Sequence, residues 1–238
     1  MRNFTKSLLS IIYSQKCIYC AKFGSYICER CKWQIGSTTF KYQTLDTTIF
    51  AGTNYSRELA RLVLAAKEDH DRSARQVLVQ LLESALRLAL KSNELMKVNA
   101  AKSSFIYLIP IPSRDSANRV RGFKHSLLLA ELLAINFATS KIIVIDCLKL
   151  SKRIRDQAGL GLSARKKNMA GAYTLQFKEP QRIYEQILQV GNQEVYILDD
   201  LVTTGATTAA AKLALANGKI TISGVLAACA TTGVYALR

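Results

Sequence analysis

From residue 47 onward, short apolar runs alternate with longer stretches whose apolar residues recur at helical spacing. A chain of this pattern folds into βαβ units, in which helices cover a largely parallel sheet. With 238 residues and 49% hydrophobic content, the sequence can bury one main α/β core and carry a small appendage. The pattern therefore favours neither a disordered chain nor a membrane protein.

The expected elements follow from this alternation. Helices are predicted over residues 55–67, 73–91, 126–138 and 206–217, the last ending at Gly218, a residue type suited to a helix C-terminus. Strands are predicted over residues 48–53, 104–111, 142–148, 172–177, 195–198 and 221–230. We expect a parallel sheet of about five strands, with ligands bound at its carboxyl edge.

Four of the six cysteines lie close together near the N-terminus, as two C-x-x-C pairs. The apolar run at residues 8–13 is shorter than the core of a signal peptide, so we expect a cytoplasmic protein. In that compartment, clustered cysteines indicate a metal site and not a disulfide framework. The predicted ligands are Cys17, Cys20, Cys28 and Cys31.

Four thiolates at this spacing would close a tetrahedral zinc site of the structural kind, which leaves no open position for water. Iron–sulfur ligation and a redox dithiol are the alternatives. We therefore predict a zinc-ribbon-like module over residues 1–40, followed by the main domain over residues 41–238.

The most informative segment joins a buried strand to the last predicted helix. The strand ends in Asp199 and Asp200, and a Thr/Gly turn then leads into an Ala-rich helix. Gly205 permits a tight turn near a ligand, and the free N–H groups of a helix start favour an anion. Adjacent carboxylates at a strand end can accept hydrogen bonds from both hydroxyls of a ribose, or hold a cation. The alternative is an ordinary strand-turn-helix with Asp and Thr as caps.

Two other segments are basic. In the first, prolines fix a strand exit that leads to Arg114 and Arg121, a residue type suited to bidentate phosphate contacts. The second, residues 152–167, carries six basic residues against one acid and contains glycines, as expected of a mobile lid over a polyphosphate. A helix-capping loop and a solvated basic face are the respective alternatives.

These segments together resemble known families. Residues 195–208 look like the motif of type I phosphoribosyltransferases that binds phosphoribosyl pyrophosphate (PRPP). Nearly the whole chain resembles the ComF family, competence-associated phosphoribosyltransferase-like proteins related to the GntX group. Lys124-His125 stand where that family has Asn-Gln. The matching residues are Pro110, Arg114, Arg121, Gly122, Phe123, Gln157, Leu160, Arg165 and Asn168.

The resemblance implies a type I phosphoribosyltransferase fold that binds PRPP with Mg²⁺ and transfers the phosphoribosyl group to an acceptor that the motif does not name. It implies a role in ribose binding for Asp199 and Asp200, and it favours zinc at the cysteines. No catalytic residue is assigned. The implied 5′-phosphate loop is Thr203, Thr204, Gly205, Ala206, Thr207 and Thr208. Candidates for pyrophosphate and lid contacts are Arg114, Arg121, Arg165 and Lys166.

Charge suggests a second class of function. Lys and Arg number 33 against 17 acidic residues, a formal charge of +16, which attracts polyanions or is simply a solvated basic surface. The alternative to an enzyme is a non-enzymatic adaptor for DNA uptake, which keeps the PRPP site and works with single-stranded DNA and competence machinery, without membrane insertion. Basic and aromatic residues of the cysteine module would contact the DNA, or the aromatics form the module's own small core. These residues are Lys16, Lys22, Arg30, Lys32, Tyr19, Phe23, Tyr26 and Trp33.

Overall fold

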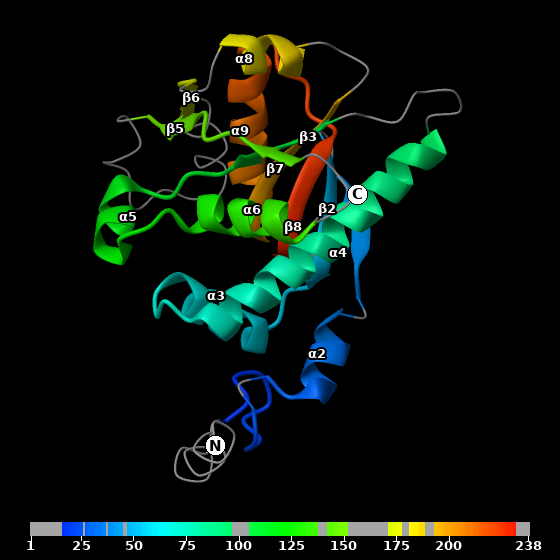
Figure 1. Ribbon diagram of the computed structural model, residues 1–238, viewed down its shortest axis with the longest axis vertical. Helices are drawn as coiled ribbons and strands as arrows, with labels where there is room; N and C mark the ends of the chain where they lie inside the picture. The colour runs from blue at the N-terminus through cyan, green and yellow to red at the C-terminus, as the bar shows by residue number, and fades with distance from the viewer. Residues whose placement is uncertain are drawn as a thin grey trace, which may run out of the picture.

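The centre of the molecule is a six-stranded sheet in the order β1-β2-β8-β7-β3-β4 (Figure 1). β1 (Phe40–Gln43) pairs antiparallel with β2 at one edge, and the other neighbours pair in parallel. The parallel strands are β2 (Thr48–Asn54), β8 (Gly224–Ala230), β7 (Gln193–Val202), β3 (Phe105–Pro110) and β4 (Ile142–Val144). This computed structural model describes residues 16–25, 27–36, 38–44, 47–96, 105–137, 142–151, 171–177, 181–188 and 193–231.

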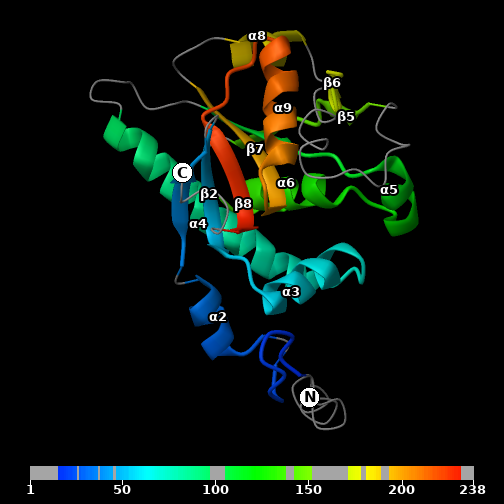
Figure 2. The same cartoon turned by 180° about the vertical axis from the view of Figure 1, so that it is seen from behind.

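Helices cover both faces of the sheet, as the opposite views of Figures 1 and 2 show. Side chains of a strand alternate between the faces, so Leu198 packs in one core cluster and Ile197 in the other. α3 (Arg57–Lys67), α4 (Arg72–Met96) and α6 (His125–Asn136) cover the first face, and α9 (Ala206–Asn217) covers the second. The predicted α/β class, with a mostly parallel sheet between helices, is confirmed.

The helix that leads to the candidate site is built from local signals. The Ser56 hydroxyl caps α3 by accepting a hydrogen bond from the Leu59 N–H at 3.1 Å. Leu59, Leu62 and Ala66 are buried at helical spacing, as the sequence predicts. The helix ends at Lys67, whose side chain reaches β7.

The prediction for the segment after α6 is wrong in part. The single strand expected over residues 142–148 is two strands: β4 ends at Val144 in the main sheet, and β5 (Leu148–Leu150) belongs to a second sheet. There it pairs antiparallel with β6 (Tyr173–Leu175), which lies within the strand predicted over residues 172–177. The run is apolar on both sides of the break, so hydrophobicity does not reveal where the strand ends.

Four other elements are short and were not predicted. They are β1, α2 (Glu29–Gly36), α5 (Asp115–Arg121) and α8 (Gln181–Leu188). β7 is also longer than predicted, because its pairing with β8 continues to Val202 opposite Ala230. The two acids therefore lie within β7, near its carboxyl end, and not in the loop after it.

The cysteine module is joined to the main core. Cys17, Cys31 and Ile35 belong to the same buried cluster as Leu78 and Leu82 of α4. A hydrogen bond of 2.6 Å between the hydroxyls of Thr38 and Thr53 also links the segment after α2 to β2. The predicted boundary after residue 40 stays a prediction. In the part of the chain that the structure describes, no helix is both long enough and apolar enough to cross a bilayer.

Candidate functional site

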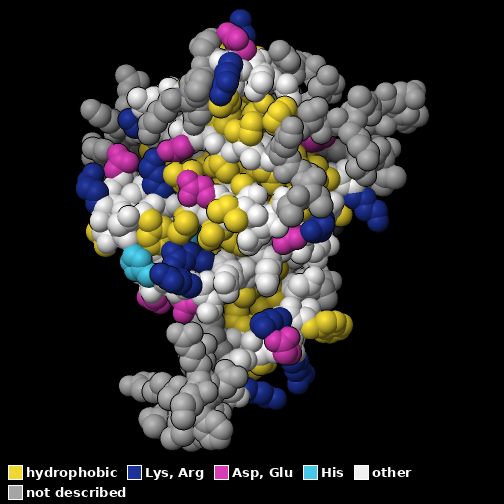
Figure 3. Space-filling view, viewed as in Figure 1, with side chains coloured by type: hydrophobic (Ala, Val, Ile, Leu, Met, Phe, Trp, Pro, Cys, Tyr) yellow, Lys and Arg dark blue, Asp and Glu magenta, His cyan; other side chains and the backbone are white. Residues whose placement is uncertain are grey.

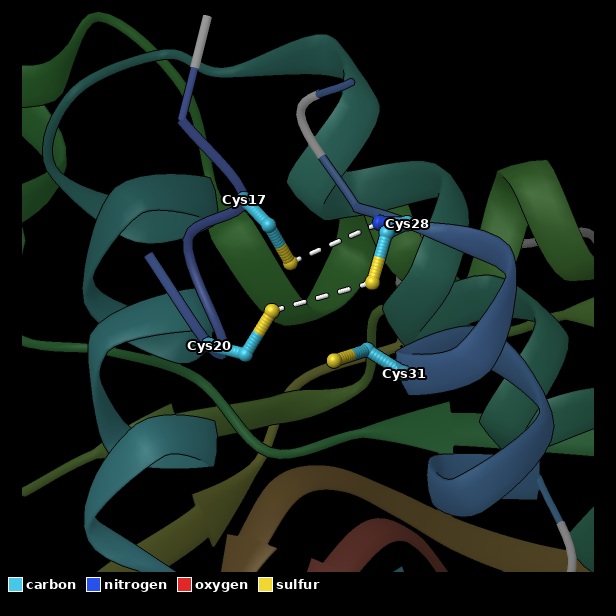
Figure 4. A group of neighbouring side chains, drawn as sticks. All are labelled: Cys17, Cys20, Cys28 and Cys31. Atoms are coloured by element: carbon cyan, nitrogen blue, oxygen red, sulfur yellow. Dashed lines mark hydrogen bonds between the residues drawn. The ribbon is translucent and has the colours of Figure 1, made fainter. Parts of the chain in front are cut away.

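The four cysteines of the N-terminal module point toward one another (Figure 4). Their Sγ atoms all lie within 4.8 Å of one another, and those of Cys20 and Cys28 are 3.7 Å apart. Cys17 and Cys20 come from a turn, closed by the Cys17 N–H donating to the Lys22 carbonyl at 2.7 Å, and Cys31 lies in the first turn of α2. The two C-x-x-C pairs thus face each other, as the spacing predicts for a four-cysteine metal site.

The surroundings of Cys17 favour a thiolate, the form that binds metals. Burial raises the pKa of this thiol, but donation from the backbone of Cys20, Cys28 and Tyr19 outweighs it and lowers the pKa to about 6. The Cys28 N–H, for example, lies 3.4 Å from the Cys17 Sγ. Burial and the neighbouring sulfurs raise the pKa of Cys31. A metal cation among the four sulfurs would favour the thiolate form of all of them, because its charge offsets their mutual repulsion.

Two of the module's aromatic side chains, Phe23 and Trp33, lie at its surface. Trp33 is 77% exposed and Phe23 is 66% exposed, so the expectation of a miniature aromatic core is wrong for both. Tyr26 lies outside the described residues. Burial in the module is supplied instead by Ile27, Ile35 and two of the cysteines. Figure 3 shows hydrophobic side chains exposed beside basic ones at this end of the molecule.

The second candidate site lies on β7. Asp199 is half-buried and Asp200 is buried, at the carboxyl end of the parallel strands where α/β sheets bind ligands. The Asp200 N–H donates to Oδ1 of Asp199 at 2.9 Å, which fixes that carboxylate against the backbone. Ile111, which follows β3, donates its N–H to the Leu198 carbonyl at 2.9 Å, so the proline loop leaves the sheet beside the two acids.

Two cationic or polar side chains reach Asp200 from neighbouring helices. Lys67, at the end of α3, lies with Nζ 3.1 Å from Oδ2 of Asp200. His125, at the start of α6, lies with Nε2 3.4 Å from the same oxygen. The imidazole is 0% exposed, and neither ring nitrogen has a hydrogen-bond partner among the described residues. It carries charge only when it is protonated.

These neighbours separate the two carboxyl groups in acidity. Burial raises the pKa of Asp199 well above its usual value, and the charge of Asp200 raises it further. Burial acts on Asp200 in the same sense, but His125 and the Lys67 charge outweigh it and lower that pKa. Asp200 is therefore the anion of the pair, and Asp199 is the member more ready to hold a proton.

The segment after the acids forms a turn that opens α9. Gly205 has φ 72°, a left-handed conformation that favours glycine. The Thr208 hydroxyl is buried and donates to the Gly205 carbonyl at 2.8 Å, so it braces the turn from inside. Thr203 and Thr204 are exposed, and Gly205, Ala206 and Thr207 are half-buried. The first N–H groups of a helix lack intrahelical partners, so the start of α9 can take an anion.

The basic candidates differ in their accessibility. Arg114 is exposed at the start of α5. Arg121 is only 8% exposed, and its Nε donates to Glu68 at 2.9 Å. A contact of Arg121 with pyrophosphate stays a prediction, and the side chain is already held by Glu68. Arg165 and Lys166 lie outside the described residues, as does the rest of the 152–170 segment.

Sequence reasoning missed Lys67 and His125 as members of the site. Lys67 ends an amphipathic helix in a polar turn, where a basic residue is ordinary. The one available signal was the departure of Lys124-His125 from the Asn-Gln of the resembled family. Comparison with known proteins adds no family, since neither a family model nor a curated protein sequence gives a significant match to this chain.

Proposed function

We propose that the chain binds a phosphorylated ribose, with PRPP as the leading candidate, and transfers its phosphoribosyl group to an acceptor. The observation that supports this most is the sequence of features along β7 and α9. Two carboxyl groups at the carboxyl edge of a parallel sheet are followed by a left-handed glycine turn into a helix of 12 residues. This is also the role that the resemblance to the ComF family implies.

In this proposal the 5′-phosphate lies against the turn of residues 203–208, and the ribose hydroxyls donate to Asp199 and Asp200. A nitrogen of the acceptor forms a bond with ribose C1 as the bond from C1 to the pyrophosphate oxygen breaks, and pyrophosphate leaves with the bonding electrons. The nitrogen then loses its proton to the solvent. Here the protein contributes mainly by holding the reactants in place and stabilising charge.

Mg²⁺ would neutralise the leaving pyrophosphate. The carboxylates fit such a cation as oxygen ligands, but Lys67 already compensates Asp200 at 3.1 Å. We therefore propose that the ion arrives with the pyrophosphate and that Asp199 is the nearer carboxylate available to it. Magnesium is commonly held by one or two carboxylates together with substrate phosphates, and not by an all-protein cage.

The direct test is calorimetry of the purified protein with PRPP in the presence of Mg²⁺. Saturable binding is expected, weakened by an excess of ribose 5-phosphate that competes for the same site. A screen of nucleobases for pyrophosphate release then asks whether binding leads to transfer. No heat and no competition would remove the proposal, and binding without release from any base would reduce it to ligand recognition.

We propose zinc as the metal of the four cysteines, because a closed set of four thiolates is typical of structural zinc. We expect the protein to act in the cytoplasm, where such thiols stay reduced.

One observation supports a second function, the binding of single-stranded DNA. Trp33 and Phe23 are exposed, and Nζ of Lys16 lies 4.9 Å from the centroid of the Phe23 ring. Exposed rings beside basic side chains can stack on unpaired bases while the charges meet the phosphates. Binding should then weaken steeply with salt, with a slope of about −0.7 per phosphate neutralised in a plot of log affinity against log salt. Anisotropy titrations at several salt concentrations measure this slope, and no binding at low salt would remove the DNA function while leaving the PRPP site untouched.

A further inference from the structure

Two turns near the carboxylate pair are fastened to each other by contacts that the proposed function does not use. Glu68, after α3, accepts the hydrogen bond from the nearly buried Arg121 at 2.9 Å. The ring centroid of Phe123 lies 5.1 Å from that of His70 and 5.2 Å from Cζ of Arg75. We name residues 121–125 the bracket, because they hold the turn between α3 and α4 against the start of α6.

Each of the two fastened turns places one side chain on the same oxygen. Lys67 directly precedes Glu68, and its Nζ lies 3.1 Å from Oδ2 of Asp200. His125 is the last residue of the bracket, and its Nε2 lies 3.4 Å from the same oxygen. This convergence restrains one oxygen of the carboxylate and leaves the other, Oδ1, outside these two contacts.

Packing alone gives no reason for a histidine at position 125. A buried polar ring without partners costs free energy that an apolar side chain of similar size would avoid. His125 is fully buried, and the nearest acidic group described for it is Asp200. The other titratable groups around that carboxylate are Asp199 beside it, Lys67 from α3, and Cys229 of β8, whose Sγ lies 3.6 Å from the Asp200 carbonyl. The position of the imidazole next to the Asp200 carboxylate accounts for a polar ring at this buried site.

We propose that Lys67 and His125 are positioning residues that fix Oδ2 of Asp200 and so aim Oδ1 at a ribose hydroxyl of the ligand, while the bracket holds both of them in place. The inference rests on the proposed function. It gives Arg121 a structural role, since its guanidinium then serves Glu68 and not the pyrophosphate. Because the positioning acts only through Asp200, it should matter for ligands that carry a ribose and not for phosphate alone.

The test compares two ligands across matched variants. Lys67→Met removes a donor to Oδ2, and His125→Leu removes the imidazole that lies next to this oxygen, while both changes keep much of the side-chain volume. Lys67→Arg keeps the charge. Lys41→Met removes the same charge from an exposed position of the edge strand β1 and is the control. Calorimetry measures the affinity of each protein for ribose 5-phosphate and for inorganic phosphate, and thermal melts verify that each is folded.

Loss of the Lys67 hydrogen bond to the charged carboxylate should weaken the binding of ribose 5-phosphate by about 10-fold or more in Lys67→Met. Loss of the imidazole beside Oδ2 should weaken it in the same direction in His125→Leu. Inorganic phosphate should stay within about 2-fold of wild type, because it would use only the turn of residues 203–208. Lys67→Arg should recover most of the ribose affinity, and Lys41→Met should change neither ligand. Equal loss for both ligands, or no loss in folded variants, would overturn the positioning role.

A measurement without ligand separates this inference from the function on which it rests. Titration of the aspartate carboxyl carbons by NMR should give a higher pKa for Asp200 in Lys67→Met and His125→Leu than in wild type and Lys41→Met. An unchanged titration overturns the contacts themselves. If the titration shifts but wild-type protein binds neither ligand, the contacts stand, and both the proposed function and the positioning of a ribose are wrong.

Discussion

The cysteine cluster and the carboxylate pair are assembled over very different distances in the sequence. The four cysteines come from a single short segment, and their sulfurs lie within 4.8 Å of one another. The site around the Asp200 carboxylate also includes Lys67, which lies 133 residues away along the chain, and His125, which comes from a third element. The first site is specified by spacing and the second by tertiary packing. The first should therefore fail when one ligand is lost, whereas the second should weaken in steps.

The largest effect is expected from loss of one buried cysteine. The protein should carry one zinc per chain, and Cys31→Ser should lose the metal and part of its structure, because zinc contributes about 10–16 kcal/mol in small zinc-folded peptides. Elemental analysis and thermal melts measure both effects. Cys147→Ala, at a buried cysteine outside the cluster, should retain the metal. Iron in place of zinc, or no metal after reductive purification, would contradict this prediction.

An intermediate effect is expected at the acids. The double change Asp199→Asn and Asp200→Asn keeps the shape but removes charge, so it should cost at least about 1–3 kcal/mol of PRPP affinity. Calorimetry with Mg²⁺ measures the loss. The proposed site is misplaced if wild type binds PRPP and the folded double variant binds it equally well.

The turn of residues 203–208 allows an independent test of the same site. Gly205→Val puts a β-branched residue at φ 72° and adds bulk where phosphate would approach, so binding should fall through strain and sterics together. Gly36→Ala, at a glycine with open space around its Cβ position in α2, is the control and should leave PRPP binding unchanged. Full phosphate binding by a folded Gly205→Val protein would show that the turn does not hold the ligand.

A smaller effect is expected in the number of protons released when the ligand binds. Burial and Asp200 raise the pKa of Asp199, whereas ribose hydroxyls or a cation favour its ionised form. Binding should therefore release up to about one proton, and affinity should rise with pH until Asp199 is ionised in the free protein. Calorimetry in two buffers of different ionisation enthalpy measures the release. It should vanish in Asp199→Asn, and proton uptake by wild type would contradict the assignment.

The smallest change in stability is expected at the surface of the cysteine module. Trp33→Ala should alter the free energy of unfolding by no more than about 0.5 kcal/mol, because the ring is 77% exposed. The same change should cost about 1–3 kcal/mol of single-stranded DNA affinity if the ring stacks on a base. Trp33→Phe keeps an aromatic face and should retain most of the binding. A large loss of stability would show that the exposed ring has a packing role.

The same contrast between local and distant contacts accounts for what the sequence predicts. Helices such as α3 and α9 follow from periodicity and end signals, and the four-cysteine cluster follows from spacing. The break between β4 and β5 was missed, because both sides of it are apolar and the partner of β5 lies more than twenty residues further along the chain. Lys67 and His125 were missed because their partner is set by how α3 and α6 pack on the sheet. Residue type alone does not contain that information.

The burial of Cys31 and Ile35 in the same cluster as Leu78 of α4 bears on how the protein is made. Synthesis adds residues from the N-terminus, so the four thiols leave the ribosome before α4 exists. A nascent chain at that stage can capture a metal ion, but the apolar side of the module lacks the α4 side chains that share its buried cluster in the folded protein. A ribosome paused before residue 72 would therefore display a metal-bound module whose hydrophobic face is only partly covered, and translation of α4 completes the cover.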